Sequence, residues 1–303
     1  MDDAISRRTL LRGAALTAAS LLVSGRLDAS ALLRGATETD RERLARWLRT
    51  LRADGLARES TALGRAVARA GELALGSPYR AHTLEAYLAA GAPHAEPLTL
   101  HLDGFDCVTL VESALAVARA ARAGSSAGWA EFAREVERMR YRGGVRAGYA
   151  SRLHYFSEWI LDGARRGLVR DMGKELGGDE DRRPLRFMTE HRSAYAALKD
   201  DATFAAIGEM ERSLDDAPRH VIPPARIPQV QSRIQTGDVL AFATSIAGLD
   251  ASHTGMAYRD RAGVLRVLHA PLSGGAVEVS RSTLHGYVSA IRRATGIMVA
   301  RPV

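Results

Sequence analysis

The sequence has little cysteine and little lysine. Its 303 residues include a single cysteine, Cys107, so no disulfide can form within the chain and no paired-cysteine zinc site is present. The H-E-x-x-H zinc motif is absent as well. Among 42 basic residues only Lys174 and Lys199 are lysines, and no basic run interleaved with aromatic residues occurs. We therefore expect no metal, no cofactor and no nucleic-acid partner.

Long apolar runs are also missing beyond the first thirty residues, where none approaches the length of about 20 residues that spans a bilayer. The N-terminus itself places Arg7 and Arg8 before an apolar stretch and an A-x-A pattern at 29–31. This order is typical of a twin-arginine export signal, although an amphipathic first helix is an alternative. We therefore predict a signal peptide at 1–31, a mature chain from Leu32, and a periplasmic or secreted protein without a membrane anchor.

The hydrophobic pattern changes from helical in the first half to strand-like near the C-terminus. Apolar residues recur at helical spacing within 40–75, and a further helix is predicted after Cys107. Short β-rich runs follow at 238–242, 253–258, 264–269, 276–279 and 296–299. Helices gathered before strands predict an α+β fold. We expect residues 32–303 to form a single domain with an insertion at about 171–234.

Cys107 is predicted to occupy the first turn of a helix, with Asp106 as the N-cap. That position would bring the sulfur near unpaired backbone N–H groups and the positive end of the helix dipole, which lower the pKa of a thiol. The carboxylate of Asp106 would act in the opposite direction, so position alone does not establish reactivity. An unpaired thiol in an exported protein favours a functional role, and an inert buried cysteine is the alternative.

Two of the nine histidines lie in neighbouring predicted strands. His253 opens one strand and His269 closes the next, with turn residues at 260–263 between them. A hairpin centred on Arg261 would place the two side chains directly opposite, with Cβ atoms about 5 Å apart. One imidazole would then take the proton of Cys107 while the other orients it, which makes the three residues a candidate triad. Structural histidines and a metal site on the pair are the alternatives.

Several blocks of the sequence carry a resemblance to a known family. They are Ser77-Pro78-Tyr79, residues 102–112 around Asp106-Cys107, Ser151-Arg152-Leu153-His154-Tyr155-Phe156, residues 236–242 and Ser252-His253-Thr254-Gly255. Over about 76–302 the chain resembles the N-acetylmuramoyl-L-alanine amidase-like family, a branch of the NlpC/P60 papain-like cysteine hydrolases. The resemblance implies a papain-like fold in which a helix that carries the cysteine packs on an antiparallel sheet that carries the histidines. It also implies Cys107 as nucleophile, His253 as base and His269 as the orienting residue.

The resemblance extends to residues around the nucleophile. It implies that Tyr79 lies in the active-site cleft and that Arg152 and His154 line the substrate channel. Asp106 and Ser252, which adjoin the implied nucleophile and base, complete the candidate substrate-binding residues.

The chain departs from the wider superfamily next to the nucleophile. Its Asp-Cys-Ser-Gly is here Asp106-Cys107-Val108-Thr109, and no Gly-Gly follows Tyr79. The superfamily's commonest activity, cleavage between D-γ-glutamate and the diamino acid, is therefore kept as an alternative. The family implies cleavage between N-acetylmuramic acid and L-alanine in peptidoglycan or a muropeptide. A metal-dependent hydrolase and a non-catalytic wall-binding protein are further alternatives.

Overall fold

The structure of the protein is a computed structural model that describes residues 38–90 and 95–303. Residues Asp40–Val303 form one compact unit. The predicted signal peptide and its cleavage site lie outside the described residues. No described helix is long and apolar enough to cross a membrane.

Five described α-helices precede the main sheet in the chain. They are α1 (Asp40–Ala53), α2 (Leu63–Leu73), α3 (Cys107–Arg122), α4 (Trp129–Arg140) and α5 (Phe156–Arg165). α3 packs against α1, α2 and α4 and also against β5 (Ala251–Arg259) of the sheet. Its small side chains, among them Ala114 and Ala118, are buried and permit this close approach. The apolar stripes expected within 40–75 are buried as well, as Leu44 and Val67 show.

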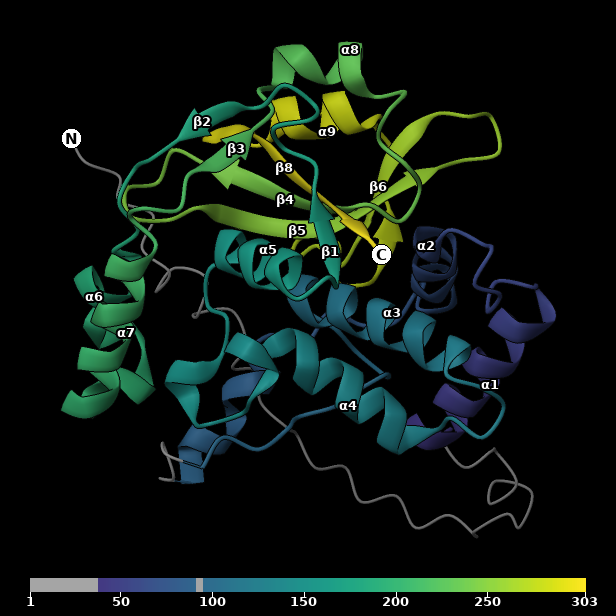
Figure 1. The fold of residues 1–303 in the computed structure, drawn as a ribbon, viewed down its shortest axis with the longest axis horizontal. Coiled ribbons are helices and arrows are strands. Elements are labelled where there is room, and N and C mark those ends of the chain that lie inside the picture. The colour runs from purple at the N-terminus through teal and green to yellow at the C-terminus, as the bar shows by residue number, and fades with distance from the viewer. Residues whose placement is uncertain (1–37, 91–94) are drawn as a thin grey trace, which may run out of the picture. The chain divides into compact units, whose positions relative to one another are not determined.

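The main sheet has the strand order β1-β8-β4-β5-β6-β7, and each neighbouring pair is antiparallel. Its remaining strands are β1 (Val169–Asp171), β4 (Val239–Thr244), β6 (Leu265–His269), β7 (Glu278–Val279) and β8 (Ala294–Pro302). The short helices α8 (Ile227–Val230) and α9 (Leu284–Ala290) complete this half. Figure 1 shows α3 and α5 on one face of the sheet and α8 and α9 on the other. These layers confirm the predicted α+β class.

Alternate side chains of β4 pack on opposite faces of the sheet. Ala241 belongs to the core that contains α3, whereas its neighbour Phe242 packs with Leu284 and Val288 of α9. Side chains alternate along a strand, so the continuous apolar run 239–243 is explained by burial on both faces.

Residues 185–214 share a hydrophobic cluster with Tyr149 and Tyr155, and the segment 171–234 as a whole forms short elements. They are β2 (Asp179–Asp181), α6 (Phe187–Glu190), η6 (Arg192–Ala194), η7 (Ala196–Lys199), α7 (Asp201–Ser213), β3 (Arg219–Val221), η8 (Pro224–Arg226) and α8. β2 pairs with β3 in a separate two-stranded sheet. Further short helices are η3 (Thr83–Ala90), η4 (Arg142–Gly144) and η5 (Tyr149–Ser151). The interpretation of residues 171–234 as an insertion remains a prediction.

Glu211 of α7 connects this segment to the residue that precedes α5. The carboxylate is fully buried, and its Oε1 accepts hydrogen bonds from the hydroxyl of Tyr155 at 2.6 Å and the backbone N–H of Met188 at 3.0 Å. The hydroxyl of Thr189 donates to the other carboxylate oxygen. Because a buried carboxylate is stable only when it is well hydrogen-bonded, these donors and Glu211 depend on one another.

Replacement of Glu211 by alanine should lower the free energy of unfolding by about 3 kcal/mol, because it leaves buried donors without an acceptor. Denaturant unfolding followed by circular dichroism measures this change. Glu209→Ala, at an exposed position on the same helix, is the matched control and should cost less than about 0.5 kcal/mol. Equal effects of the two substitutions would show that the buried hydrogen bonds do not stabilise the segment.

Candidate active site

Cys107 is the first residue of α3, and Asp106 is its N-cap, as the sequence predicts. Oδ1 of Asp106 accepts hydrogen bonds from the backbone N–H groups of Val108 at 3.0 Å and Thr109 at 2.7 Å. The hydroxyl of Thr109 accepts in return from the backbone N–H of Asp106 at 2.9 Å. Thr109 therefore completes a capping box that fixes the start of the helix.

The surroundings of Cys107 favour the neutral thiol. Burial, and then the carboxylate of Asp106, raise the pKa of Cys107 to about 12. Backbone N–H groups of Thr254, Cys107 and Val108 hydrogen-bond to the sulfur and lower the pKa, but they do not outweigh burial. The helix terminus thus lowers the pKa of Cys107, as expected from the sequence. Desolvation raises it by more, so the net shift is upward. A nucleophilic role requires a base that takes the proton of the thiol.

His253 of β5 and His269 of β6 are in contact. Nε2 of His253 lies 2.9 Å from Nδ1 of His269, and the rings meet edge to face. The sequence therefore correctly predicts that the two histidines meet. Burial, and then His269, lower the pKa of His253 to about 3, and burial lowers the pKa of His269 to about 4. Both imidazoles are consequently neutral at neutral pH.

The predicted register of the two histidines is wrong. β5 and β6 pair Met256 with Leu268, so the hairpin is centred one residue later than expected and the two histidines are diagonal neighbours. The turn explains the shift, because the backbone N–H of Asp260 donates to the carbonyl of Val264 at 3.0 Å and closes the loop between these residues. Gly263 adopts a positive φ of 79° within that loop, which glycine tolerates.

Gly255 leaves room for the diagonal contact. A Cβ at this position would lie 3.0 Å from the Cβ of His269, closer than ordinary side-chain contacts allow. The hydroxyl of the preceding Thr254 donates to the carbonyl of Leu240 at 2.7 Å and ties this part of β5 to β4. Thr254 and Gly255 of the block 252–255 therefore have structural roles, a hydrogen bond between strands and space for His269.

Aromatic residues surround the imidazole pair. Phe242 of β4 stacks on His253 with ring centroids 5.4 Å apart. The hydroxyl of Tyr287 in α9 lies 3.3 Å from Nδ1 of His269. Sequence reasoning missed both residues, because no spacing relates β4 and the short α9 to the two histidines before the chain is folded.

The thiol and the imidazole pair share their neighbours. The backbone N–H that Thr254 offers to Cys107 is adjacent to His253 in the chain. Burial raises the pKa of Tyr287 to about 12, with further contributions from Glu278 and Cys107, so Tyr287 is near the thiol as well as His269. Tyr79 is close to the thiol as well. Burial, and then the nearby Cys107 and Asp106, raise the pKa of Tyr79 to about 12.

Arg152 and His154 occupy a different environment. The guanidinium of Arg152 is 6% exposed and forms ion pairs with Glu85 at 3.2 Å and Glu96 at 3.5 Å. Nε2 of His154 is 2.8 Å from the carbonyl of Tyr149, and burial lowers the pKa of His154 well below its usual value. Within the described part of the chain, the polar contacts of Arg152 and His154 are with these residues and not with Cys107, His253 or His269.

Ser252 is exposed on the strand beside His253. Asp106, the other candidate for substrate binding, uses one carboxylate oxygen for the helix cap. Of the candidate substrate-binding residues, Tyr79, Asp106 and Ser252 thus lie next to the thiol or the imidazole pair.

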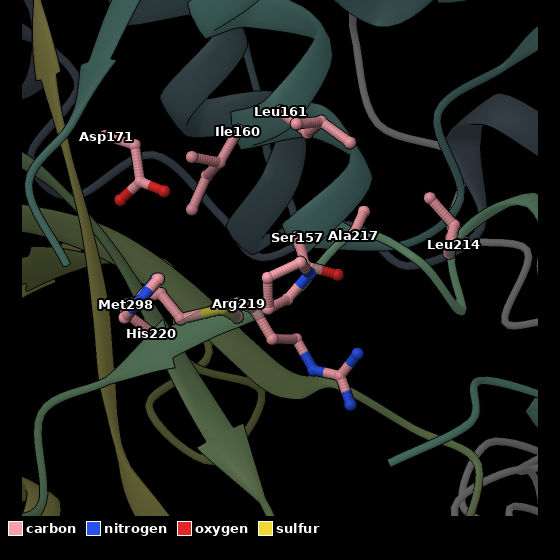
Figure 2. Close-up of a pocket in the computed structure, with 10 residues that line it drawn as sticks. Ser157, Ile160, Leu161, Asp171, Leu214, Ala217, Arg219, His220 and Met298 are labelled. Atoms are coloured by element: carbon pink, nitrogen blue, oxygen red, sulfur yellow. The ribbon is translucent and has the colours of Figure 1, made fainter. Parts of the chain in front are cut away.

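Two other features lie outside this site. Figure 2 shows a cavity whose lining includes Ile160 of α5, His220 of β3 and Met298 of β8, and none of the predicted site residues lines it. Within 38–90 and 95–303, the ligand atoms of Asp40, His101 and Asp103 lie within 4.8 Å of one another and could hold a cation. Both carboxylates of that group already have partners, as Asp103 pairs with Arg80 at 2.7 Å and Asp40 accepts from a backbone N–H at 3.0 Å.

Comparisons with known proteins identify the family. A family model described as N-acetylmuramoyl-L-alanine amidase-like matches residues 69–297. A crystal structure of an N-acetylmuramoyl-L-alanine amidase from Bacteroides uniformis is 32% identical, with a TM-score of 0.73, and the match covers 80% of this chain and 99% of that chain. A Bacteroides fragilis protein provisionally named a xylanase is 34% identical, with a TM-score of 0.70, and the match covers 77% and 99% of the two chains.

A more distant structure, from Legionella pneumophila, is 19% identical with a TM-score of 0.62 over 87% of this chain and 94% of that one, and it supports the fold alone. No curated protein matches the chain significantly. The family match spans most of the described residues and includes Cys107, His253 and His269. The protein belongs to the N-acetylmuramoyl-L-alanine amidase-like family.

Proposed function

We propose that the protein is a cysteine amidase that hydrolyses the amide bond between N-acetylmuramic acid and L-alanine in peptidoglycan or a muropeptide. Cys107 would be the nucleophile, His253 the base and His269 the residue that orients it. The observation that carries the proposal is the 2.9 Å contact between Nε2 of His253 and Nδ1 of His269, together with the hydrogen bond from the backbone N–H of Thr254, the residue after His253, to the thiol of Cys107. Membership of the amidase-like family supports the choice of bond.

The proposed reaction begins with a neutral thiol and a neutral imidazole. Nε2 of His253 is turned toward His269, which leaves Nδ1 as the base for the thiol proton. The thiolate of Cys107 attacks the lactyl carbonyl of N-acetylmuramic acid, and negative charge develops on the carbonyl oxygen. The backbone N–H of Cys107 is a donor for this oxyanion.

Collapse of the tetrahedral intermediate breaks the C–N bond and forms a thioester on Cys107. Protonated His253 gives its proton to the leaving amine, which is the amino group of L-alanine. Water activated by the same imidazole then hydrolyses the thioester, releases the lactyl carboxylate and restores the thiol. The site needs His253 in its neutral form twice, and burial favours that form.

The side chains that meet here argue against glycoside hydrolysis, which the provisional name of one relative indicates. Glycosidases ordinarily place two carboxylic acids on either side of the glycosidic bond. The two carboxylates at this site, Asp106 and Glu278, are the N-cap of α3 and a neighbour of His269, and the groups around them are a thiol, two imidazoles and two phenols. The endopeptidase alternative would use the same triad on a different amide bond, so the identity of the product distinguishes it from the amidase.

Export through the twin-arginine pathway is part of the proposal. The arginine pair Arg7-Arg8, the apolar stretch and the A-x-A pattern at 29–31 support it. Residues 32–303 would then be the mature catalytic domain, delivered to the compartment where peptidoglycan is found.

Products released from purified peptidoglycan and soluble muropeptides test the reaction. The protein should release intact stem peptides that begin with free L-alanine, identified by mass spectrometry. Cys107→Ala should lower the rate by about a thousandfold or more, because no other group can form the thioester. Fragments that begin with the diamino acid would establish the endopeptidase instead. Equal release by the protein and by Cys107→Ala would end the proposal of cysteine catalysis.

The pH dependence of kcat/KM tests the role of the buried base. Because burial lowers the pKa of His253 to about 3, the neutral form persists as the pH falls through 6.5 and is lost only near the lower value. We expect the acid limb of the profile to have its midpoint below pH 5, with circular dichroism as the control for folding. A midpoint near 6.5, the ordinary pKa of histidine, would show that the base is not buried as described.

The substitution Asp106→Asn separates the charge of Asp106 from its role as N-cap. Asparagine caps helices as well as aspartate does, but it removes the carboxylate that raises the pKa of Cys107. Alkylation of Cys107 by iodoacetamide at pH 8 should therefore become severalfold faster, as measured by mass spectrometry of the protein. Asp106→Ala, which loses the cap as well, is the comparison for helix stability. An unchanged or slower alkylation of Asp106→Asn would contradict the electrostatic effect of this carboxylate.

A further inference from the structure

The hydrogen bonds of His269 are complete on only one side of its ring. Nδ1 meets Nε2 of His253 at 2.9 Å and the hydroxyl of Tyr287 at 3.3 Å. Nε2 is buried and has no hydrogen-bond partner in the described part of the chain, in a side chain that is 1% exposed. A buried N–H without an acceptor loses its hydration and gains nothing in return, so the tautomer of His269 depends on what lies beside Nε2.

The carboxylate beside Nε2 belongs to Glu278, whose Oε1 is 3.8 Å away. The pairing of β6 with β7 sets Glu278 directly opposite His269, so the two side chains lie on the same face of the sheet. The side chain of Glu278 is 51% exposed, which leaves it room to rotate. Gly274 keeps space for the carboxylate, because a Cβ there would lie 3.2 Å from Oε2.

The proposed base imposes a proton arrangement on both rings. If Nδ1 of His253 takes the proton of Cys107, the resting proton of His253 is on Nε2 and is donated to His269. Nδ1 of His269 must then be an acceptor, so His269 carries its own proton on Nε2. The hydroxyl of Tyr287 also approaches this Nδ1, and since a hydroxyl can donate or accept, the contact is compatible with either tautomer.

We propose that Glu278 is a positioning residue that rotates over the ring of His269, accepts the hydrogen bond of its Nε2–H and thereby holds both histidines in the tautomers that leave Nδ1 of His253 free. The inference rests on the proposed function, because it adds a fourth member to the same triad. The negative charge of Glu278 also stabilises the positive charge that forms on the imidazole pair when His253 takes the thiol proton.

The tautomers are measurable without any substrate. Two-bond ¹H–¹⁵N spectra of the protein labelled with ¹⁵N-histidine report which ring nitrogen carries the proton, and the spectrum of His269→Gln identifies the signals of His269. We expect His269 to be protonated on Nε2 in the unmodified protein. Glu278→Ala should shift its signals toward a mixture of the two tautomers. Glu278→Gln, whose amide oxygen still accepts a hydrogen bond, should retain the original tautomer.

Kinetics on the muropeptide test the consequence for catalysis. Glu278→Ala should lower kcat at least about tenfold and leave KM within about twofold, because Glu278 acts through His269 and not on the substrate. Glu278→Gln should recover much of kcat. Glu209→Ala, which removes an exposed carboxylate from α7, is the matched control and should leave kcat unchanged.

The two measurements separate the failure of this inference from that of the proposed function. A proton on Nδ1 of His269 in the unmodified protein overturns the inference, and so does Glu278→Ala with an unchanged tautomer or an unchanged kcat. If the unmodified protein releases no stem peptide, the proposed function fails, and the spectra alone decide whether Glu278 sets the tautomer.

Discussion

The packing of α3 against β5 is the interaction on which the candidate site depends. α3 is buried along most of its length. The thiol of its first residue, Cys107, accepts a hydrogen bond from the backbone N–H of Thr254. The same burial that brings Cys107 to Thr254, the residue after His253, also raises the pKa of the thiol to about 12. The core therefore both builds the site and keeps the thiol neutral, so the proposed nucleophilic role requires a neighbouring base in addition to the helix terminus.

The imidazole pair meets that requirement in a way that also depends on burial. Its two rings are held by a diagonal contact between β5 and β6, which Gly255 permits, and both are neutral because desolvation lowers the pKa of each. Because the thiol and the proposed base are both neutral at rest, the proton would be transferred when the thiol attacks the substrate. The direction of that transfer then depends on the tautomers of the two rings, which the neighbouring Glu278 is proposed to set.

Much of the local structure could be predicted from the sequence. Helical spacing within 40–75, the start of a helix at Cys107 and the short strands near the C-terminus are all present, because each follows from the period of buried residues and from a cap within a few positions. The family resemblance is confirmed by the family match and the structural relatives. The predicted register of the hairpin was wrong by one residue. The actual register is set by the hydrogen bonds of the turn at Asp260 and not by the symmetry of the flanking pattern.

The sequence by itself determined the α+β class, the capped helix that begins at Cys107 and the presence of two histidines on neighbouring strands, since these depend on residues close together in the chain. Only the tertiary structure decided which groups surround them. Phe242, Tyr287 and Glu278 reach the histidines from three other elements, and Arg152 and His154 are drawn into a cluster with Glu85 and Tyr149. The pKa of each group was decided there too, because desolvation depends on how densely distant segments pack around it.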